Sequence, residues 1–114
     1  MAGNVVFIDY EEGVKRMMNN AKFYLKLLVK FKDETKIDKL ETALADGDLE
    51  KAYNEAHALK GVAANLSFPE LIKQIVELES QIKAKSVNPG QVDTVKNTFA
   101  QTMQEVIKVI EQNG

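Results

Sequence analysis

Several residue types that carry chemistry in proteins are absent or rare in this sequence. It contains no cysteine and no tryptophan, two prolines and a single histidine among 114 residues. The lack of cysteine excludes disulfides, thiolate zinc sites and a cysteine nucleophile, and it is typical of a reducing compartment, so we expect a cytoplasmic protein. Uninterrupted apolar runs are only a few residues long, which predicts neither a signal peptide nor membrane insertion.

Size and charge narrow the classes of function further. A chain of 114 residues and 12.7 kDa suits one core, so we expect residues 1–114 to form a single domain. The net charge of −2 is balanced between fifteen basic and seventeen acidic residues, which does not favour nucleic acid as a partner. Glycine-rich phosphate loops, HExxH and carboxylates at metal-ligand spacing are missing, so the sequence predicts no autonomous kinase or metallohydrolase.

Apolar residues recur at spacings of three and four along nearly the whole chain, which predicts an all-α fold. Short connections favour antiparallel neighbours, and we expect an up-and-down four-helix bundle with a short additional N-terminal helix. Asp9, with Glu12 three positions on, predicts the start of that short helix, which reaches about Met17. The remaining helices are expected at about 21–32, 37–45, 49–65, 68–85 and from about 91, with Ser67 as the N-cap of the fourth of these.

Two apolar stripes define the expected core contacts of the second and the last helix. The stripe of the helix from residue 21 comprises Phe23, Tyr24, Leu27, Leu28 and Phe31. The last helix follows an a/d seam through Val92, Val95, Phe99, Met103, Val106 and Ile110. Its opposite face is polar, with Gln91, Lys96, Gln101, Gln104 and Lys108, so we expect a monomer.

The single histidine, His57, is predicted to point away from the core. On a helical wheel for residues 49–65, the apolar residues Ala52, Ala56, Leu59 and Ala63 cluster roughly 140° from His57. Lys60, Gly61 and Ala64 fall on the histidine side, and Tyr53 and Asn54 extend that side toward the N-terminus of the helix. The sequence therefore predicts an exposed imidazole beside a lysine.

Gly61 is unusual in the interior of a helix, where it costs about 0.5–1 kcal/mol relative to alanine. One interpretation is that a partner approaches the helix closely at this point, and another is that glycine relieves crowding where helices cross. The position of Gly61 away from the core favours the first. Lys60 alone is an ordinary solvated cation, but beside a neutral imidazole its ammonium group suits an anion built on the ring.

The segment Ala56-His57-Ala58-Leu59-Lys60-Gly61, followed by Asn65-Leu66 and Leu71, resembles the signature of histidine phosphotransfer (HPt) domains of two-component phosphorelays. The resemblance extends upstream through residues 13–16, 23–31 and 43–48 and covers nearly the whole chain. One departure is Ser67, where many members of the family carry glycine. The last helix carries no signature beyond its periodicity.

The resemblance implies that His57 is the phospho-acceptor, which takes a phosphoryl group from a receiver phospho-aspartate and relays it to another receiver. It implies that Lys60 stabilises the phosphoryl group and that Tyr53, Asn54, Gly61 and Ala64 dock the partner. The phosphate is expected on the far ring nitrogen. No intrinsic cofactor or metal is implied, because Mg²⁺ is expected from the receiver. The implied partners are response-regulator receiver domains, a hybrid sensor histidine kinase, or both.

Two other classes of function remain open from the sequence. A non-catalytic adaptor of the same ancestry would bind receivers or kinases without phosphotransfer, but it would have no need of His57, Lys60 and Gly61 together. An unrelated structural bundle that oligomerises would expose apolar residues on the outer face of its last helix, which is polar here.

Overall fold

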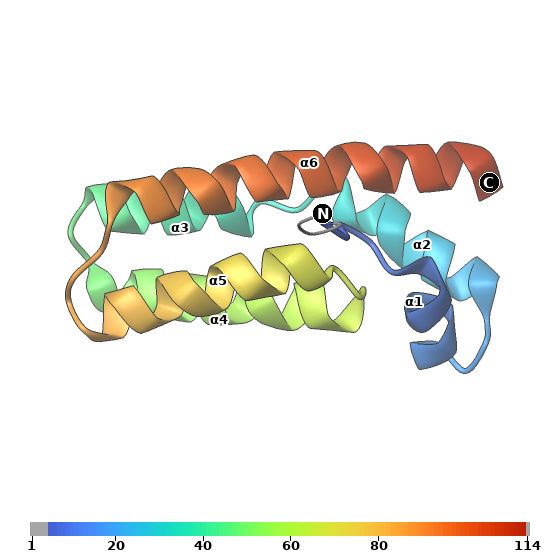
Figure 1. Cartoon of the computed structure of the whole chain (residues 1–114), viewed down its shortest axis with the longest axis horizontal. Helices are drawn as coiled ribbons and strands as arrows, with labels where there is room; N and C mark the ends of the chain where they lie inside the picture. Colours follow the sequence, from blue (N-terminus) through green and yellow to red (C-terminus); the bar gives the residue numbers. More distant parts are fainter. Residues whose placement is uncertain (1–4, 114) are drawn as a thin grey trace.

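The computed structural model describes residues 5–113 and contains six helices in that part of the chain. Figure 1 shows their arrangement along the long axis of the molecule. The helices are α1 (Tyr10–Arg16), α2 (Ala21–Phe31), α3 (Lys36–Ala45), α4 (Leu49–Asn65), α5 (Pro69–Lys83) and α6 (Pro89–Asn113). Each boundary lies within about two residues of its prediction, because helix ends are set by local capping residues.

Three of the helices begin at side chains that cap their first backbone N–H groups. The carboxylate of Asp9 accepts a hydrogen bond from the Glu12 amide, and that of Asp48 accepts one from the Lys51 amide. The side chain of Asn20 does the same for the Phe23 amide. Each bond satisfies a donor that lacks a partner within its own helix. The Asp9 and Asp48 caps confirm the predicted starts of the N-terminal helix and of the helix that carries His57.

The predicted cap of α5 is wrong. Phe68 occupies the N-cap position, and Pro69 is the first helical residue, as expected. Ser67 instead has a φ angle of 61°, and its hydroxyl donates to Oε1 of Glu12 at 3.0 Å. The hydroxyl is therefore turned toward α1 and does not accept a bond from α5. This left-handed conformation favours glycine, which is a physical reason for the glycine expected here in many members of the family that the sequence resembles.

The bundle is built around the longest helix, α6, which runs along the whole molecule (Figure 1). It contacts α3 along its first part and α2 along its later part. The consecutive pairs α3–α4, α4–α5 and α5–α6 also pack against each other. The predicted all-α fold and the helical bundle are confirmed. The predicted arrangement of four antiparallel helices with one short helix is not confirmed, because α2 and α3 pack one after the other along α6.

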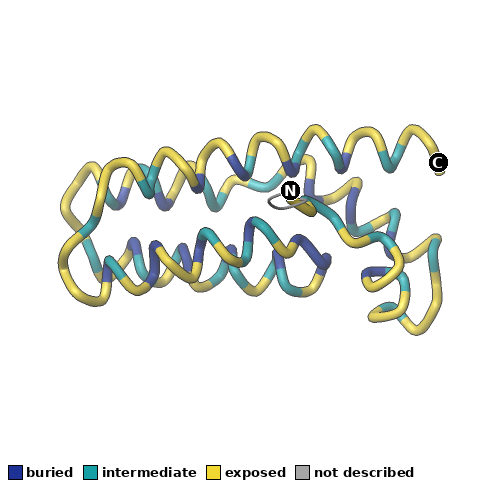
Figure 2. The backbone as a smooth tube through the Cα atoms, in the orientation of Figure 1, coloured by how far each residue is buried: buried dark blue, intermediate teal, exposed yellow. Residues whose placement is uncertain are grey.

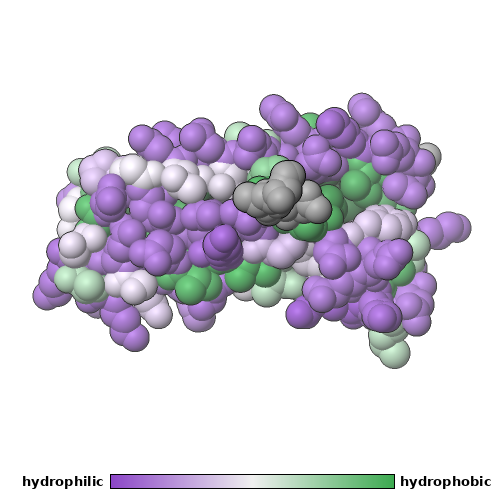
Figure 3. Space-filling model, viewed as in Figure 1, coloured by the Kyte–Doolittle hydropathy of each residue, from purple (hydrophilic) through white to green (hydrophobic). Residues whose placement is uncertain are grey.

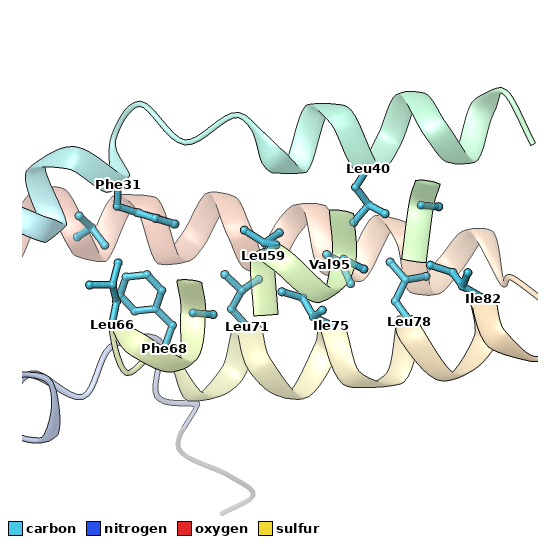
Figure 4. Packing of buried hydrophobic residues seen from close by; sticks show 14 of the residues in the cluster. Phe31, Leu40, Leu59, Leu66, Phe68, Leu71, Ile75, Leu78, Ile82 and Val95 are labelled. Carbon is cyan, nitrogen blue, oxygen red and sulfur yellow. The ribbon is translucent and has the colours of Figure 1, made fainter. Parts of the chain in front are cut away.

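The core runs continuously between these helices. In Figure 2 the buried positions recur along the inward side of each helix, while the outward sides are exposed. Figure 4 shows the interior, where Phe31 of α2 and Phe68 meet at one end and Leu40 of α3 approaches Leu78 and Val95 farther along. The rings of Phe31 and Phe68 lie edge to face with centroids 4.9 Å apart, a favoured aromatic geometry.

Two predicted stripes differ in detail from the observed core. Phe23 is 46% exposed, because the stripe of α2 is centred on Tyr24, Leu28 and Phe31, which are buried. In α6 the most buried residues are Val95, Thr98, Thr102 and Val106. The other predicted seam residues, Val92, Phe99, Met103 and Ile110, are only partly buried and pack on the core from its edge. The helix is therefore rotated by part of a turn from the orientation that apolar residues alone suggest.

The segment before α1 and the helix α2 are both hydrogen-bonded to the turn between α4 and α5. The Asp9 amide donates to the Ser67 carbonyl at 2.9 Å, and the buried Tyr24 hydroxyl donates to the Leu66 carbonyl at 2.6 Å. Burial is the main cause that raises the pKa of Tyr24 above its ordinary value, so the hydroxyl stays a donor. These bonds fix the C-terminal end of α4 from outside the helix.

No helix within residues 5–113 is both long and apolar enough to cross a membrane.

Gly13 and Gly61 are both helical glycines, but their surroundings differ. A Cβ atom on Gly13 would overlap Cζ of Tyr24, whereas a Cβ on Gly61 would meet no atom within 4 Å. We expect Gly13→Ala to lower the free energy of unfolding by about 1–3 kcal/mol through overpacking, and Gly61→Ala to raise it by about 0.5–1 kcal/mol. Urea denaturation of the two variants measures both changes. Shifts of the same sign would contradict this interpretation of the two sites.

Candidate functional site

Helix α4 has one buried face and one face that is exposed to solvent. Ala52, Ala56, Leu59 and Ala63 are completely buried against neighbouring helices, which leaves the residues on the other side in solvent. The side chain of His57 is 64% exposed. The predicted direction of His57, away from the core, is confirmed.

The imidazole of His57 is held by a carboxylate from the neighbouring helix. Nδ1 of His57 lies 3.1 Å from Oε2 of Glu79 on α5, and Nζ of Lys60 lies 2.9 Å from Oε1 of the same carboxylate. The Glu79 side chain is only 9% exposed. A buried carboxylate is costly unless it is paired, and here each of its oxygens has a cationic or polar partner. We call these three residues, His57, Lys60 and Glu79, the His57 site.

This geometry assigns different roles to the two ring nitrogens of His57. An ionised carboxylate only accepts hydrogen bonds, and a neutral imidazole carries one N–H donor and one acceptor nitrogen. For a neutral ring beside an ionised Glu79, the contact of 3.1 Å requires the proton on Nδ1, which donates it to Glu79. Nε2 then keeps its lone pair, on a ring that is largely exposed to solvent. Such a nitrogen is a nucleophile that an incoming group can reach.

Tyr53 restricts the same ring from its other side. Its aromatic ring is nearly parallel to the imidazole, with centroids 6.1 Å apart and an angle of 11° between the planes. The two residues are four positions apart on α4, so they lie one above the other along the helix. Glu79 and Tyr53 together limit how the imidazole can rotate.

The other predicted docking residues lie on this face with different exposures. Asn54 and Gly61 are exposed and Ala64 is partly buried. Tyr53 and Asn54 also line an open hollow of about 600 Å³ between the start of α4 and the end of α5, together with Leu49, Glu50, Ile82, Lys83 and Lys85. The surface beside His57 therefore has both a recess and an open stretch of helix.

The surroundings of Gly61 decide between its two interpretations. A Cβ atom at this position would meet no atom within 4 Å, so no helix crossing of the described chain is crowded there. A glycine that no internal contact requires leaves the α4 backbone open to another molecule.

Lys60 is placed beside His57 as predicted, but its charge is directed at Glu79. The side chain is 31% exposed, so its stem is largely covered while the ammonium group still reaches solvent. The sequence-based interpretation treated Lys60 as a free counter-charge for an anion. In the structure it neutralises a buried carboxylate, and any anion on the imidazole would share it with Glu79.

Glu79 was missed by the sequence analysis, although a signal was present. The buried stripe of α5 includes Ile75, Leu78 and Ile82, and Glu79 is four residues after Ile75 and three before Ile82. An apolar residue is expected at such a position. A buried carboxylate at such a position requires a polar or cationic partner from another helix. The exposed histidine and lysine predicted on residues 49–65 were candidates for that partner.

Comparison with protein-family models gives a match to the Hpt domain over residues 26–108. This range begins within α2, ends within α6 and includes all three residues of the His57 site. No curated protein and no solved structure matches the chain.

The tautomer of His57 can be tested directly. Glu79→Leu removes the acceptor for the Nδ1 proton, whereas Glu79→Gln retains a carbonyl oxygen that can accept it. We expect ¹⁵N NMR of the imidazole to show the Nδ1–H form in the parent protein and in Glu79→Gln, and a smaller share of that form in Glu79→Leu. An unchanged share in Glu79→Leu would show that Glu79 does not set the tautomer.

Proposed function

The chain belongs to the Hpt domain family, and from that premise we propose that His57 accepts a phosphoryl group from the phospho-aspartate of a receiver domain and passes it to the aspartate of another receiver. Members of this family have a general role in histidine phosphotransfer within phosphorelays, and they interact with receiver domains and kinases. The observation that carries the proposal is the exposed imidazole whose Nδ1 is bonded to Glu79, since it leaves Nε2 as the nucleophile.

In the first step the lone pair of Nε2 attacks the phosphorus atom of the phospho-aspartate. A nitrogen–phosphorus bond forms, the bond from phosphorus to the aspartyl oxygen breaks, and the aspartate leaves as a carboxylate. The ring retains its Nδ1 proton and gains positive charge, which the carboxylate of Glu79 stabilises at 3.1 Å. The second transfer is the same reaction in reverse, with the carboxylate of the next receiver as the nucleophile.

Lys60 has two tasks in this proposal. Before transfer it pairs with the Glu79 carboxylate at 2.9 Å, which offsets the cost of burying that charge. After transfer its ammonium group, one turn along α4 from His57, offsets the charge of the phosphoryl oxygens. Phosphoryl transfer depends on in-line positioning and on neutralisation of charge. The magnesium ion that contributes to both is to come from the receiver, which brings its own aspartates.

The receiver is proposed to dock over the open face of α4. Gly61 and Ala64 allow close approach on the C-terminal side of His57, and Tyr53 and Asn54 offer a recess on its N-terminal side. A partner that covers this face excludes water from the reacting groups. Direct transfer through a docked pair also requires no nucleotide site on this chain.

The first test uses the only histidine of the chain. We expect incubation with magnesium and receivers phosphorylated by acetyl phosphate to add one phosphoryl group, seen by intact mass, that is acid-labile and base-stable. His57→Gln should fold normally, because the side chain is 64% exposed, and should gain nothing. Phosphorylation of the folded variant at a histidine-type linkage would refute the assignment. Binding of a receiver without any transfer would favour the adaptor.

Gly61 provides an independent test of docking. We expect Gly61→Leu to lower the second-order rate of phosphotransfer by at least about tenfold, because a bulky side chain would hold the receiver away from His57. Gly61→Ala is the matched control with a minimal side chain, and it should retain most of the rate. Circular dichroism and urea denaturation show whether both variants are folded. An unaltered rate for folded Gly61→Leu would contradict close approach at this position.

A further inference from the structure

Charge is unevenly distributed along the chain. Residues 15–39 contain eight basic and three acidic residues, whereas the rest of the sequence contains seven basic and fourteen acidic ones. The small net charge of −2 therefore hides a basic region, which covers the end of α1, all of α2 and the start of α3. Hydrophilic side chains cover most of the end of the molecule that α1 and α2 form, with apolar residues visible between them (Figure 3).

The basic region is most regular on α2. Lys22, Lys26 and Lys30 are spaced four residues apart, are all exposed, and form one row along the helix, which we call the α2 lysine row. The helix contains no acidic residue. Among residues 5–113 no carboxylate forms an ion pair with any of the three lysines. Like charges four residues apart destabilise a helix, so the row brings α2 no stabilisation beyond the favourable position of Lys30 in the last turn.

Apolar residues accompany the α2 lysine row. Phe23 and Val29 are 46% and 48% exposed, and on the helix they lie on the same outward side as the lysines. Exposed aromatic and aliphatic side chains can provide the apolar contact of an interface, and the lysines around them can orient a partner of opposite charge.

The row leads into a recess that adjoins the face of His57. Lys30 lines a hollow of about 240 Å³ between α2, α3 and α4, with Leu27, Phe31, Glu34, Lys36, Val62, Asn65 and Leu66. Val62 directly follows Gly61 on α4. Asn65 lies eight residues beyond His57, which is about 12 Å along the helix axis. Lys30 thus connects the α2 lysine row to the hollow, and Val62 connects the hollow to the open backbone at Gly61. We treat the row, the hollow and Gly61 together as one surface.

We propose that this surface docks an acidic patch of the receiver domain that exchanges the phosphoryl group with His57. Carboxylates of the receiver contact the α2 lysine row, and an apolar side chain beside them enters the hollow. The proposal rests on the proposed function for the reaction, and it adds which part of the chain selects the partner. Charges outside the reacting centre steer encounter and reject partners of the wrong sign.

A protein partner fits this surface better than an anionic membrane. The hollow is concave, and its lining includes Asn65 and the ion pair of Glu34 with Lys36 at 3.3 Å. A recess with a few polar groups in its lining can orient one side chain. A lipid surface would instead require the apolar residues to protrude.

The experiment compares two double charge reversals in the full chain. Lys26→Glu with Lys30→Glu alters the α2 lysine row. Lys73→Glu with Lys108→Glu changes the net charge by the same amount at exposed positions of α5 and α6. The rate of phosphotransfer from an acetyl-phosphate-treated receiver is measured against receiver concentration at low and high ionic strength. Equilibrium binding of the same receiver is measured in parallel on a His57→Gln background.

We expect the reversal on α2 to raise the KM for the phosphorylated receiver by at least about tenfold with little change in kcat, and to weaken equilibrium binding to the same extent. High salt should raise the KM of the parent protein but not that of the α2 variant. The control reversal should leave both parameters near their parent values.

The possible failures are distinguishable. If the parent protein transfers phosphate and the α2 reversal leaves KM and binding unchanged, the docking surface is overturned and the proposed function stands. If no receiver phosphorylates the parent protein but binding still depends on Lys26 and Lys30, the function fails and the docking surface stands. Loss of binding to vesicles of anionic phospholipid in the α2 variant, with receiver binding intact, would overturn the proposal in favour of a membrane.

Discussion

The buried carboxylate of Glu79 is the interaction on which the His57 site depends. It can remain in the interface between α4 and α5 only because Nδ1 of His57 and Nζ of Lys60 each occupy one of its oxygens. In return Glu79 accepts a hydrogen bond from Nδ1 of an imidazole that is 64% exposed to solvent. Removal of Glu79 would leave both His57 and Lys60 without this partner, whereas removal of either of them would leave one oxygen of the buried carboxylate without its partner. An exposed histidine is thus given a defined tautomer, which solvent alone does not provide.

The packing of α4 sets the distances within this site. Its buried face consists largely of alanines, and small side chains allow neighbouring helices to approach closely. At the far end of α4 the turn is held by the Tyr24 hydroxyl on the Leu66 carbonyl and by the Asp9 amide on the Ser67 carbonyl. These hydrogen bonds order the C-terminal end of α4 before any partner binds. Preorganisation of this kind reduces the conformational entropy that is lost on binding.

The two proposals assign chemistry and partner choice to different parts of the exposed surface. The chain belongs to a family with a general role in phosphorelay, and the proposed reaction uses His57 and the groups that orient it. The α2 lysine row lies apart from that chemistry and is free to differ in charge without any effect on the tautomer of the ring. Separation of this kind allows partner choice to change while the reacting group is preserved.

The sequence alone determined the features that depend on neighbouring residues: the start of α1 at Asp9, the start of α4 at residue 49, and the outward direction of His57. Capping and helical periodicity act within a few positions of the chain, so they can be interpreted locally. Tertiary structure decided the partner of Lys60, the bond from His57 to Glu79 across 22 positions, and the bond from Ser67 to Glu12 across 55. Those contacts depend on how whole helices rotate and cross, which is set by the packing of both faces at once.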